Sequence, residues 1–304
     1  MEPLKPARNY EEQIDRLIQF HALEIEDRDA AAEILSRVNY YRLSAYGIGL
    51  MRKDDREKYQ RGISLLHLYR LYEFDSALRS ALFHLIEHVE IELRTQFAYH
   101  HSLRYGPEGY RDATNFSDRL NNAGKSIHAM TMEKLDAEIQ RQRHLPCVLH
   151  HKAKYGGHFP AWAAVELFTF GMLSSIYSIL KLEDQKQIAG FYGVKSIHLR
   201  SWIRSLVEVR NRCAHYGRIY NMPFAQAPYL FREYRPYQSN KIFPVLLVLH
   251  RMTNGRSWWR EFYRVLTGLM RDYTEARPDF MGFPENWEAL LGAGVAPDLS
   301  LIHI

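Results

Sequence analysis

The side chains best suited to chemistry lie together in residues 204–221, which read RSLVEVRNRCAHYGRIYN. His215 supplies an imidazole, the side chain that gains and loses protons near neutral pH. Arg210 supplies a permanent planar cation, whose N–H groups match the oxygens of a phosphate. An acid–base group beside fixed cations favours metal-free chemistry on a phosphodiester.

A helix is expected over residues 196–216, ending near Gly217. Side chains at i, i+4 and i+7 share one face of a helix. At about 100° per residue, Arg210 projects roughly 140° away from His215. The shared face consists of Arg204, Glu208, Asn211 and His215, and Glu208 is expected to support the site.

RNA is the phosphodiester that fits this set, because it carries its own nucleophile, the 2′-hydroxyl. His215 would take the proton of that hydroxyl, and an acid would protonate the leaving 5′-oxygen. Arg210 would hold the non-bridging oxygens of the transition state, and Asn211 would orient the histidine or bind the phosphate. The alternative is a surface ion-pair set at a helix end, which the spacing alone does not exclude.

A second polar stripe runs along the apolar helix expected over residues 64–104. Its members follow at spacings of 3, 4 and 7 residues and are Glu87, Glu90, Arg94 and His101. One interpretation is internal salt bridging, Glu90 to Arg94 at i, i+4. The other is support of Arg210 and His215 from behind the site, as outer-shell groups do around metal ligands.

Further cations surround the proposed site, while the net charge of +5 permits a polyanionic partner without establishing one. The residues predicted to contact RNA are Arg204, Arg212, Arg218 and Asn221. Cys213 is interpreted as a small buried residue rather than a nucleophile. His150, His151 and His158 have no carboxylate at metal-ligand spacing, so neither a metal nor another cofactor is expected.

The composition of the 304 residues, 46% hydrophobic and 25% charged, is that of an ordinary globular protein. The two cysteines, Cys147 and Cys213, argue against a disulfide scaffold. No apolar signal region opens the chain, and no apolar run approaches about 18 residues. A cytoplasmic location without membrane association is therefore expected.

The hydrophobic periodicity predicts an all-α fold throughout. Asn9, with Glu12 three residues later, and Asp27 are predicted helix caps. Asn115 or Ser117 is predicted to cap the helix over 118–144. The expected helices cover 9–21, 27–38, 39–47, 64–104, 118–144, 161–180, 183–192, 196–216, 242–253 and 256–275.

Several segments resemble the Abi-like abortive-infection proteins of the AbiD/AbiF type, which are members of the HEPN superfamily. The most specific is Val209–His215 together with Arg218 and Asn221. The other matching segments are Lys5-Pro6, Tyr10–Ile14, Asn39–Tyr46, Leu71–Asp75, Arg94–His100 and Tyr105–Pro107.

The resemblance implies an HEPN-type helical bundle with an N-terminal helical extension, in which two copies meet across the active cleft. It implies a metal-independent endoribonuclease of phage defence or of a toxin–antitoxin pair, which leaves a 2′,3′-cyclic phosphate. Arg210 and His215 would be catalytic and Asn211 supporting. Tyr216 stands where relatives often carry a second histidine. A homodimer is expected, and a non-coding RNA or protein antitoxin is a candidate partner.

Two other classes of function stay open, a non-catalytic RNA-binding or scaffold protein of phage defence and a helical toxin that acts through a protein partner. The expected divisions are an N-terminal helical region at 1–62, an HEPN-like domain with inserted helices at 63–275, and a tail at 276–298. The last six residues, Leu299–Ile304, match the translation of a sequencing-library adapter and are expected to be an artefact.

Overall fold

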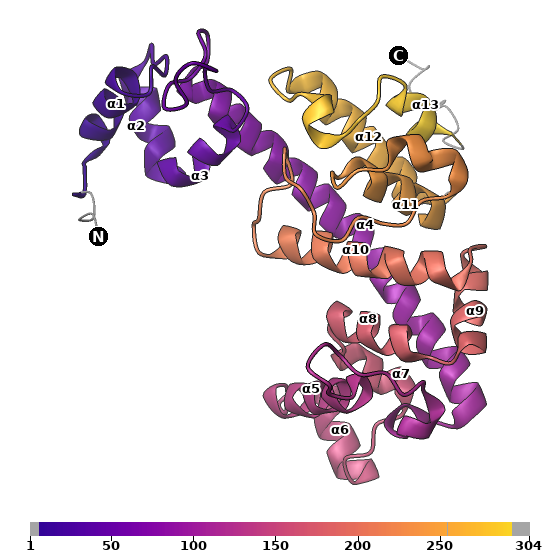
Figure 1. Ribbon diagram of the computed structural model, residues 1–304. Coiled ribbons are helices and arrows are strands. Elements are labelled where there is room, and N and C mark those ends of the chain that lie inside the picture. Colours follow the sequence, from indigo (N-terminus) through magenta and orange to yellow (C-terminus); the bar gives the residue numbers. More distant parts are fainter. Residues whose placement is uncertain (1–5, 254, 294–304) are drawn as a thin grey trace, which may run out of the picture.

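The structure is a computed structural model that describes residues 6–253 and 255–293 (Figure 1). These residues form helices, turns and loops, without a β-strand, so the predicted all-α class is confirmed. The α-helices are α1 Tyr10–Gln19, α2 Arg28–Arg37, α3 Tyr40–Ser44, α4 Leu65–Tyr105, α5 Ile127–Arg141, α6 Pro146–Tyr155, α7 Ala161–Ala164, α8 Phe170–Ile179, α9 Leu182–Phe191, α10 Ser196–Ala214, α11 Phe243–Thr253, α12 Ser257–Asp272 and α13 Trp287–Gly292. Short 3₁₀ turns are η1 Ala45–Gly47, η2 Gly109–Arg111, η3 Ala113–Asn115, η4 Val165–Leu167, η5 Arg232–Tyr237 and η6 Pro278–Met281. No helix within these residues is both long and apolar enough to cross a membrane.

Helix α4 is the axis of the fold, with 41 residues and a length of about 60 Å. Ser64 caps its first turn, and Gly106, at φ +81°, ends it. The N-terminal helices α1–α3 gather at one end of α4 and α5–α8 at the other (Figure 1). Between them, α10 crosses α4 and α12 packs along it.

The predicted helix starts at the N-terminus are confirmed in detail. The side chain of Asn9 accepts a hydrogen bond from the Glu12 amide, and the Glu12 carboxylate accepts one from the Asn9 amide. Asp27 caps α2 by accepting from the Ala30 amide. Local capping chemistry therefore sets both boundaries.

The predicted helix over 118–144 is wrong in its first part. Helix α5 begins only at Ile127, and its cap is Ser126 rather than Asn115 or Ser117. The Asn121 side chain accepts hydrogen bonds from the amides of Ala123 and Lys125, which closes a turn instead of a helix. Asparagine competes with helical hydrogen bonding in this way.

The predicted helix over 161–180 is interrupted after η4. Thr169 leaves the helical conformation and caps α8 by accepting from the Met172 amide. Because both halves are apolar on most faces, the periodicity does not reveal the interruption. Helix α6 was not predicted, although Pro146 at its start and Gly156, in the left-handed region at its end, are typical boundary residues.

The segment predicted as a C-terminal tail is packed as far as the structure describes it. Trp287 and Leu291 of α13 are buried, and the indole of Trp259 donates to the Leu291 carbonyl at 3.1 Å. The predicted artefact, Leu299–Ile304, and the end of the tail lie outside the described residues.

Candidate functional site

Arg210 of α10 is held by a carboxylate from the axial helix. Its Nε lies 3.1 Å from Glu90 Oε2, and its Nη2 lies 3.4 Å from Oε1. Arg94, one turn along α4, donates to the same Oε1 at 2.5 Å and to the Phe168 carbonyl at 2.8 Å. Glu90 is 5% exposed, so one buried carboxylate is shared by two guanidinium groups.

This sharing leaves positive charge at Arg210. A single carboxylate neutralises only one of the two cations, and the Arg210 side chain is still 27% exposed. Asn211 adds an acceptor, because its Oδ1 takes a hydrogen bond from Arg210 Nη1 at 3.1 Å. All three guanidinium nitrogens thus donate to Glu90 or Asn211. Within the described residues, one N–H of Nη1 and one of Nη2 remain for an anion.

His215 occupies the C-cap of α10 and is exposed. Its amide donates to the Asn211 carbonyl at 3.0 Å, and within the described residues its imidazole has no hydrogen-bond partner. The next residue, Tyr216, is left-handed at φ +57°, and the Gly217 amide returns to the Arg212 carbonyl at 2.8 Å. A Cβ at Gly217 would lie 2.7 Å from the Arg212 side chain, so this position needs glycine. We call residues 215–221, where the chain leaves α10, the exit turn.

A buried aspartate of α4 fixes the chain that follows His215. Asp75 Oδ1 accepts from the amides of Ile219 at 3.0 Å and Tyr220 at 2.7 Å. Its Oδ2 accepts from the hydroxyl of Tyr46 at 2.7 Å and from Arg79. Asp75 has no exposed surface, so water does not solvate its carboxylate and the protein's own donors must compensate its charge.

Residues of the N-terminal region also form hydrogen bonds with the exit turn. Arg42 donates to the Tyr216 carbonyl at 2.8 Å, and Asn221 Nδ2 donates to the Ile48 carbonyl at 2.8 Å. Residues 39–48, 71–79 and 216–221 therefore meet in one place, although they are far apart in the sequence. Their meeting fixes the backbone on the C-terminal side of His215.

The model of a protein family described as Abi-like protein matches residues 33–221, more than half of the chain. The chain belongs to the Abi-like protein family. The match extends from α2 to Asn221 and includes Asp75, Glu90, Arg210 and His215. Membership supports a role in abortive infection or phage defence. No curated protein and no solved structure matches the chain.

Two predicted residues of this Abi-like chain, Glu208 and Arg212, contact the loop over residues 222–226. The Glu208 carboxylate accepts from Arg212 at 3.1 Å and from the amides of Ala225 at 3.0 Å and Gln226 at 2.8 Å. Arg212 also lies 4.4 Å above the ring of Phe224. In this structure Glu208 and Arg212 therefore hold residues 222–226 against α10.

Arg218 and Asn221, also predicted to contact RNA, lie within the exit turn. Arg218 Nη2 is 2.9 Å from Met222 Sδ, and burial lowers the pKa of its guanidinium. Asn221 is left-handed at φ +51°, and its Oδ1 accepts from Lys241 at 3.2 Å. Of the four predicted RNA contacts, Arg204 is the one that is exposed.

The polar stripe of α4 divides into three environments. Glu90 and Arg94 make the i, i+4 bridge of the first interpretation, and Glu90 also bonds Arg210. Glu87 is exposed beside His84, 3.8 Å away. His101 is buried and stacks on Phe97 and Phe116, away from the shared carboxylate.

His101 gives the first prediction, on pH-dependent stability. Burial lowers the pKa of His101 below its ordinary 6.5, so the folded chain keeps a neutral imidazole while the unfolded chain protonates first. Unfolding is favoured as the pH falls below about 6.5, because the unfolded state binds the extra proton. His101→Phe keeps an aromatic ring and removes this titration, so urea unfolding between pH 7 and 5 should depend less steeply on pH. The same change at the exposed His144 is the control, and an equal slope in both variants would contradict the interpretation.

Two other candidates from the sequence have no reactive environment. Burial raises the pKa of the Cys213 thiol to about 12, so it does not supply a thiolate at neutral pH. Within the described residues, no three histidine, cysteine, aspartate or glutamate side chains gather as metal ligands.

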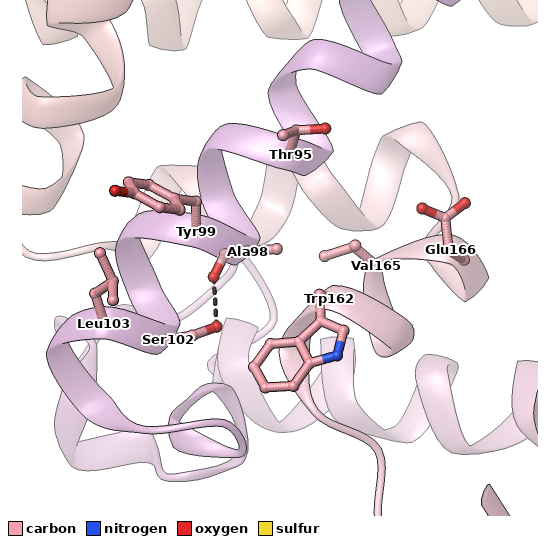
Figure 2. A pocket seen from close by; sticks show the side chains of 8 residues that line it. All are labelled: Thr95, Ala98, Tyr99, Ser102, Leu103, Trp162, Val165 and Glu166. Carbon is pink, nitrogen blue, oxygen red and sulfur yellow. Dashed lines mark hydrogen bonds between the residues drawn. The ribbon is translucent and has the colours of Figure 1, made fainter.

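A groove between α4 and α7 is lined by residues that were not predicted to form the site (Figure 2). It encloses about 380 Å³, and the side chains of Tyr99, Leu103 and Trp162 dominate its lining. Glu166 stands at one side, and Ser102 is bound to the Ala98 carbonyl of its own helix. The lining is mainly apolar and offers no acid–base pair for the proposed chemistry.

Proposed function

We propose that this Abi-like protein is a metal-independent endoribonuclease that acts in phage defence or as a toxin. The observation that carries the proposal is the anchored guanidinium of Arg210, which keeps free N–H groups five residues before the exposed imidazole of His215. Glu90 and Asn211 hold the guanidinium, so little reorganisation is needed when charge develops on a phosphate.

In the proposed reaction, neutral His215 takes the proton of a ribose 2′-hydroxyl. The 2′-oxygen then forms a bond to the adjacent phosphorus, and the bond from phosphorus to the 5′-oxygen breaks. Arg210 binds the non-bridging oxygens while negative charge builds on them. A general acid returns a proton to the 5′-oxygen, so the products are a 2′,3′-cyclic phosphate and a 5′-hydroxyl.

The proposal includes a homodimer, in which the general acid is the equivalent histidine of a second copy. Exposure of His215 at a helix end makes it reachable from outside the chain. A non-coding RNA or protein antitoxin is proposed to block the same site until infection.

The reaction is expected to proceed at an unchanged rate, within about twofold, when a chelator removes divalent ions, because each proposed step uses a side chain of the protein. Cleaved RNA from such assays should carry cyclic-phosphate and 5′-hydroxyl ends, which enzymatic end-labelling distinguishes.

The cleavage rate per protein chain should fall when the protein is diluted, because two copies form the proposed site.

Loss of activity in chelator with recovery on adding Mg²⁺ would refute the metal-free mechanism. Products with 3′-hydroxyl and 5′-phosphate ends would refute attack by the 2′-hydroxyl.

A further inference from the structure

A second groove, with a polar lining, lies beside α10, between that helix, α8 and residues 119–127. It has a volume of about 640 Å³ and is open to solvent. Its polar lining contains arginine, asparagine and serine but no carboxylate, and includes Arg119, Asn121, Ser174, Ser178, Arg200 and Arg204.

One wall of the groove is tied firmly to α8. Ser117 Oγ donates to the Ile179 carbonyl at 2.7 Å, and Arg119 Nη1 donates to the Ser178 carbonyl at 2.9 Å. The Ile127 amide returns to the Arg119 carbonyl at 3.1 Å, which closes the segment at the start of α5. The arginine on this wall is therefore held in place before any ligand arrives.

The opposite wall presents Arg200 and Arg204, one turn apart on α10. Within the part of the chain that the structure describes, neither forms an ion pair. Glu208 is the carboxylate at i+4 from Arg204, but its oxygens are occupied by Arg212, Ala225 and Gln226 as described above. The positive charge on this wall is thus left for an external anion.

The arginines of the groove lie on the same helix, α10, as the residues of the proposed active site. Residues 200, 204 and 211 share a helix face, because they are spaced by four and seven positions. At 1.5 Å per residue, Asn211 lies about 10 Å and His215 about 16 Å beyond Arg204 along the axis. A single strand that lies in the groove is therefore directed toward Asn211 and His215.

We infer that this groove binds the sugar–phosphate backbone of single-stranded RNA next to the cleaved bond, an inference that rests on the proposed RNA substrate. Guanidinium donors in a lining without a carboxylate suit phosphate and sugar oxygens. Such contacts position the strand without reading its bases. The groove therefore contributes to the affinity for RNA and to the orientation of the strand, but not to sequence preference.

The test measures binding separately from cleavage. A fluorescent single-stranded oligonucleotide with 2′-O-methyl groups throughout has no free 2′-hydroxyl and cannot be cut by the proposed reaction. Its affinity is measured by anisotropy over a range of salt concentrations. The test variant is Arg200→Gln with Arg204→Gln. The matched control is Arg260→Gln with Arg264→Gln, which removes two exposed arginines at the same spacing on α12.

The groove variant is expected to bind on the order of tenfold more weakly at about 0.15 M salt. Its slope of log affinity against log salt should be shallower by about 1.4, since each lost phosphate contact contributes about 0.7 for single strands. Arg204→Gln alone should give about half of that change in slope, while the control pair should resemble the unaltered protein. Circular dichroism confirms that each variant is folded.

Unchanged affinity and slope in the groove variant would overturn the inference, as would equal losses in both pairs of variants. A protein that binds as expected but cuts no RNA would support the groove and refute the nuclease, so the two failures are distinguishable.

Discussion

Replacing His215 with alanine is expected to slow RNA cleavage by about 100-fold to 10,000-fold, the usual contribution of a positioned general acid or base. The imidazole is exposed and has no hydrogen-bond partner in the described part of the chain, so stability should stay unchanged. Arg210→Ala should slow cleavage by about 100-fold to 1,000-fold, because it removes a donor to the developing charge. Arg210→Lys should recover little, because an ammonium does not reproduce the planar fork that Glu90 and Asn211 orient.

The measurement is single-turnover cleavage of cellular RNA, with circular dichroism to confirm the fold. His84→Ala is the control, because His84 is an exposed histidine of α4. Cleavage at an unaltered rate by both the His215 and the Arg210 variants would contradict the assignment of the site.

The second large effect is expected at Asp75, which joins α4 to the exit of α10. Asp75→Ala leaves Arg79 buried without its counter-charge and removes the acceptor of the amides of Ile219 and Tyr220. Breaking a buried pair in this way costs about 3–5 kcal/mol. The free energy of unfolding, measured in urea, should fall by about that amount.

Cleavage should also weaken in the Asp75 variant, because the turn beside His215 is no longer fixed. The control is Asp15→Ala, which removes a half-exposed partner of Arg28 and should change stability by less than about 1 kcal/mol. Equal stabilities for the two variants would show that Asp75 does not anchor the exit of α10.

Those parts of the fold that are set by neighbouring residues could be predicted from the sequence. The caps at Asn9 and Asp27 bond amides three residues away. The apolar pattern of α4 is uninterrupted, so helix periodicity predicts it. The interruption at Thr169 could not be predicted, because apolar residues on both sides hide the change of direction. The turn at Asn121 depends on one side chain bonding its own backbone, which periodicity does not report.

The candidate site was predictable to a similar extent. Residue types and their spacing indicated Arg210 and His215 as candidate catalytic residues. Glu90 and Arg94 were expected either to bridge each other or to support the site. Asp75 was missed as an anchor, because its partner Tyr220 lies 145 residues away. The available signal was an acidic residue at a core position of an apolar helix, next to Phe74 and one turn from Leu71 and Leu78. The contacts of Glu208 and Arg212 with residues 222–226 were also missed, because they depend on how the chain folds back after α10 and not on helix periodicity.

The most direct test is a structure of the protein bound to an RNA whose 2′-hydroxyl is methylated at the cleaved nucleotide. We expect the phosphate at that position to lie within hydrogen-bonding distance of Arg210, with the imidazole of His215 facing the methylated 2′-oxygen. The imidazole comes from the same chain or from a second copy. A phosphate bound elsewhere, with Arg210 and His215 on separate surfaces that no second copy joins, would contradict the central claim.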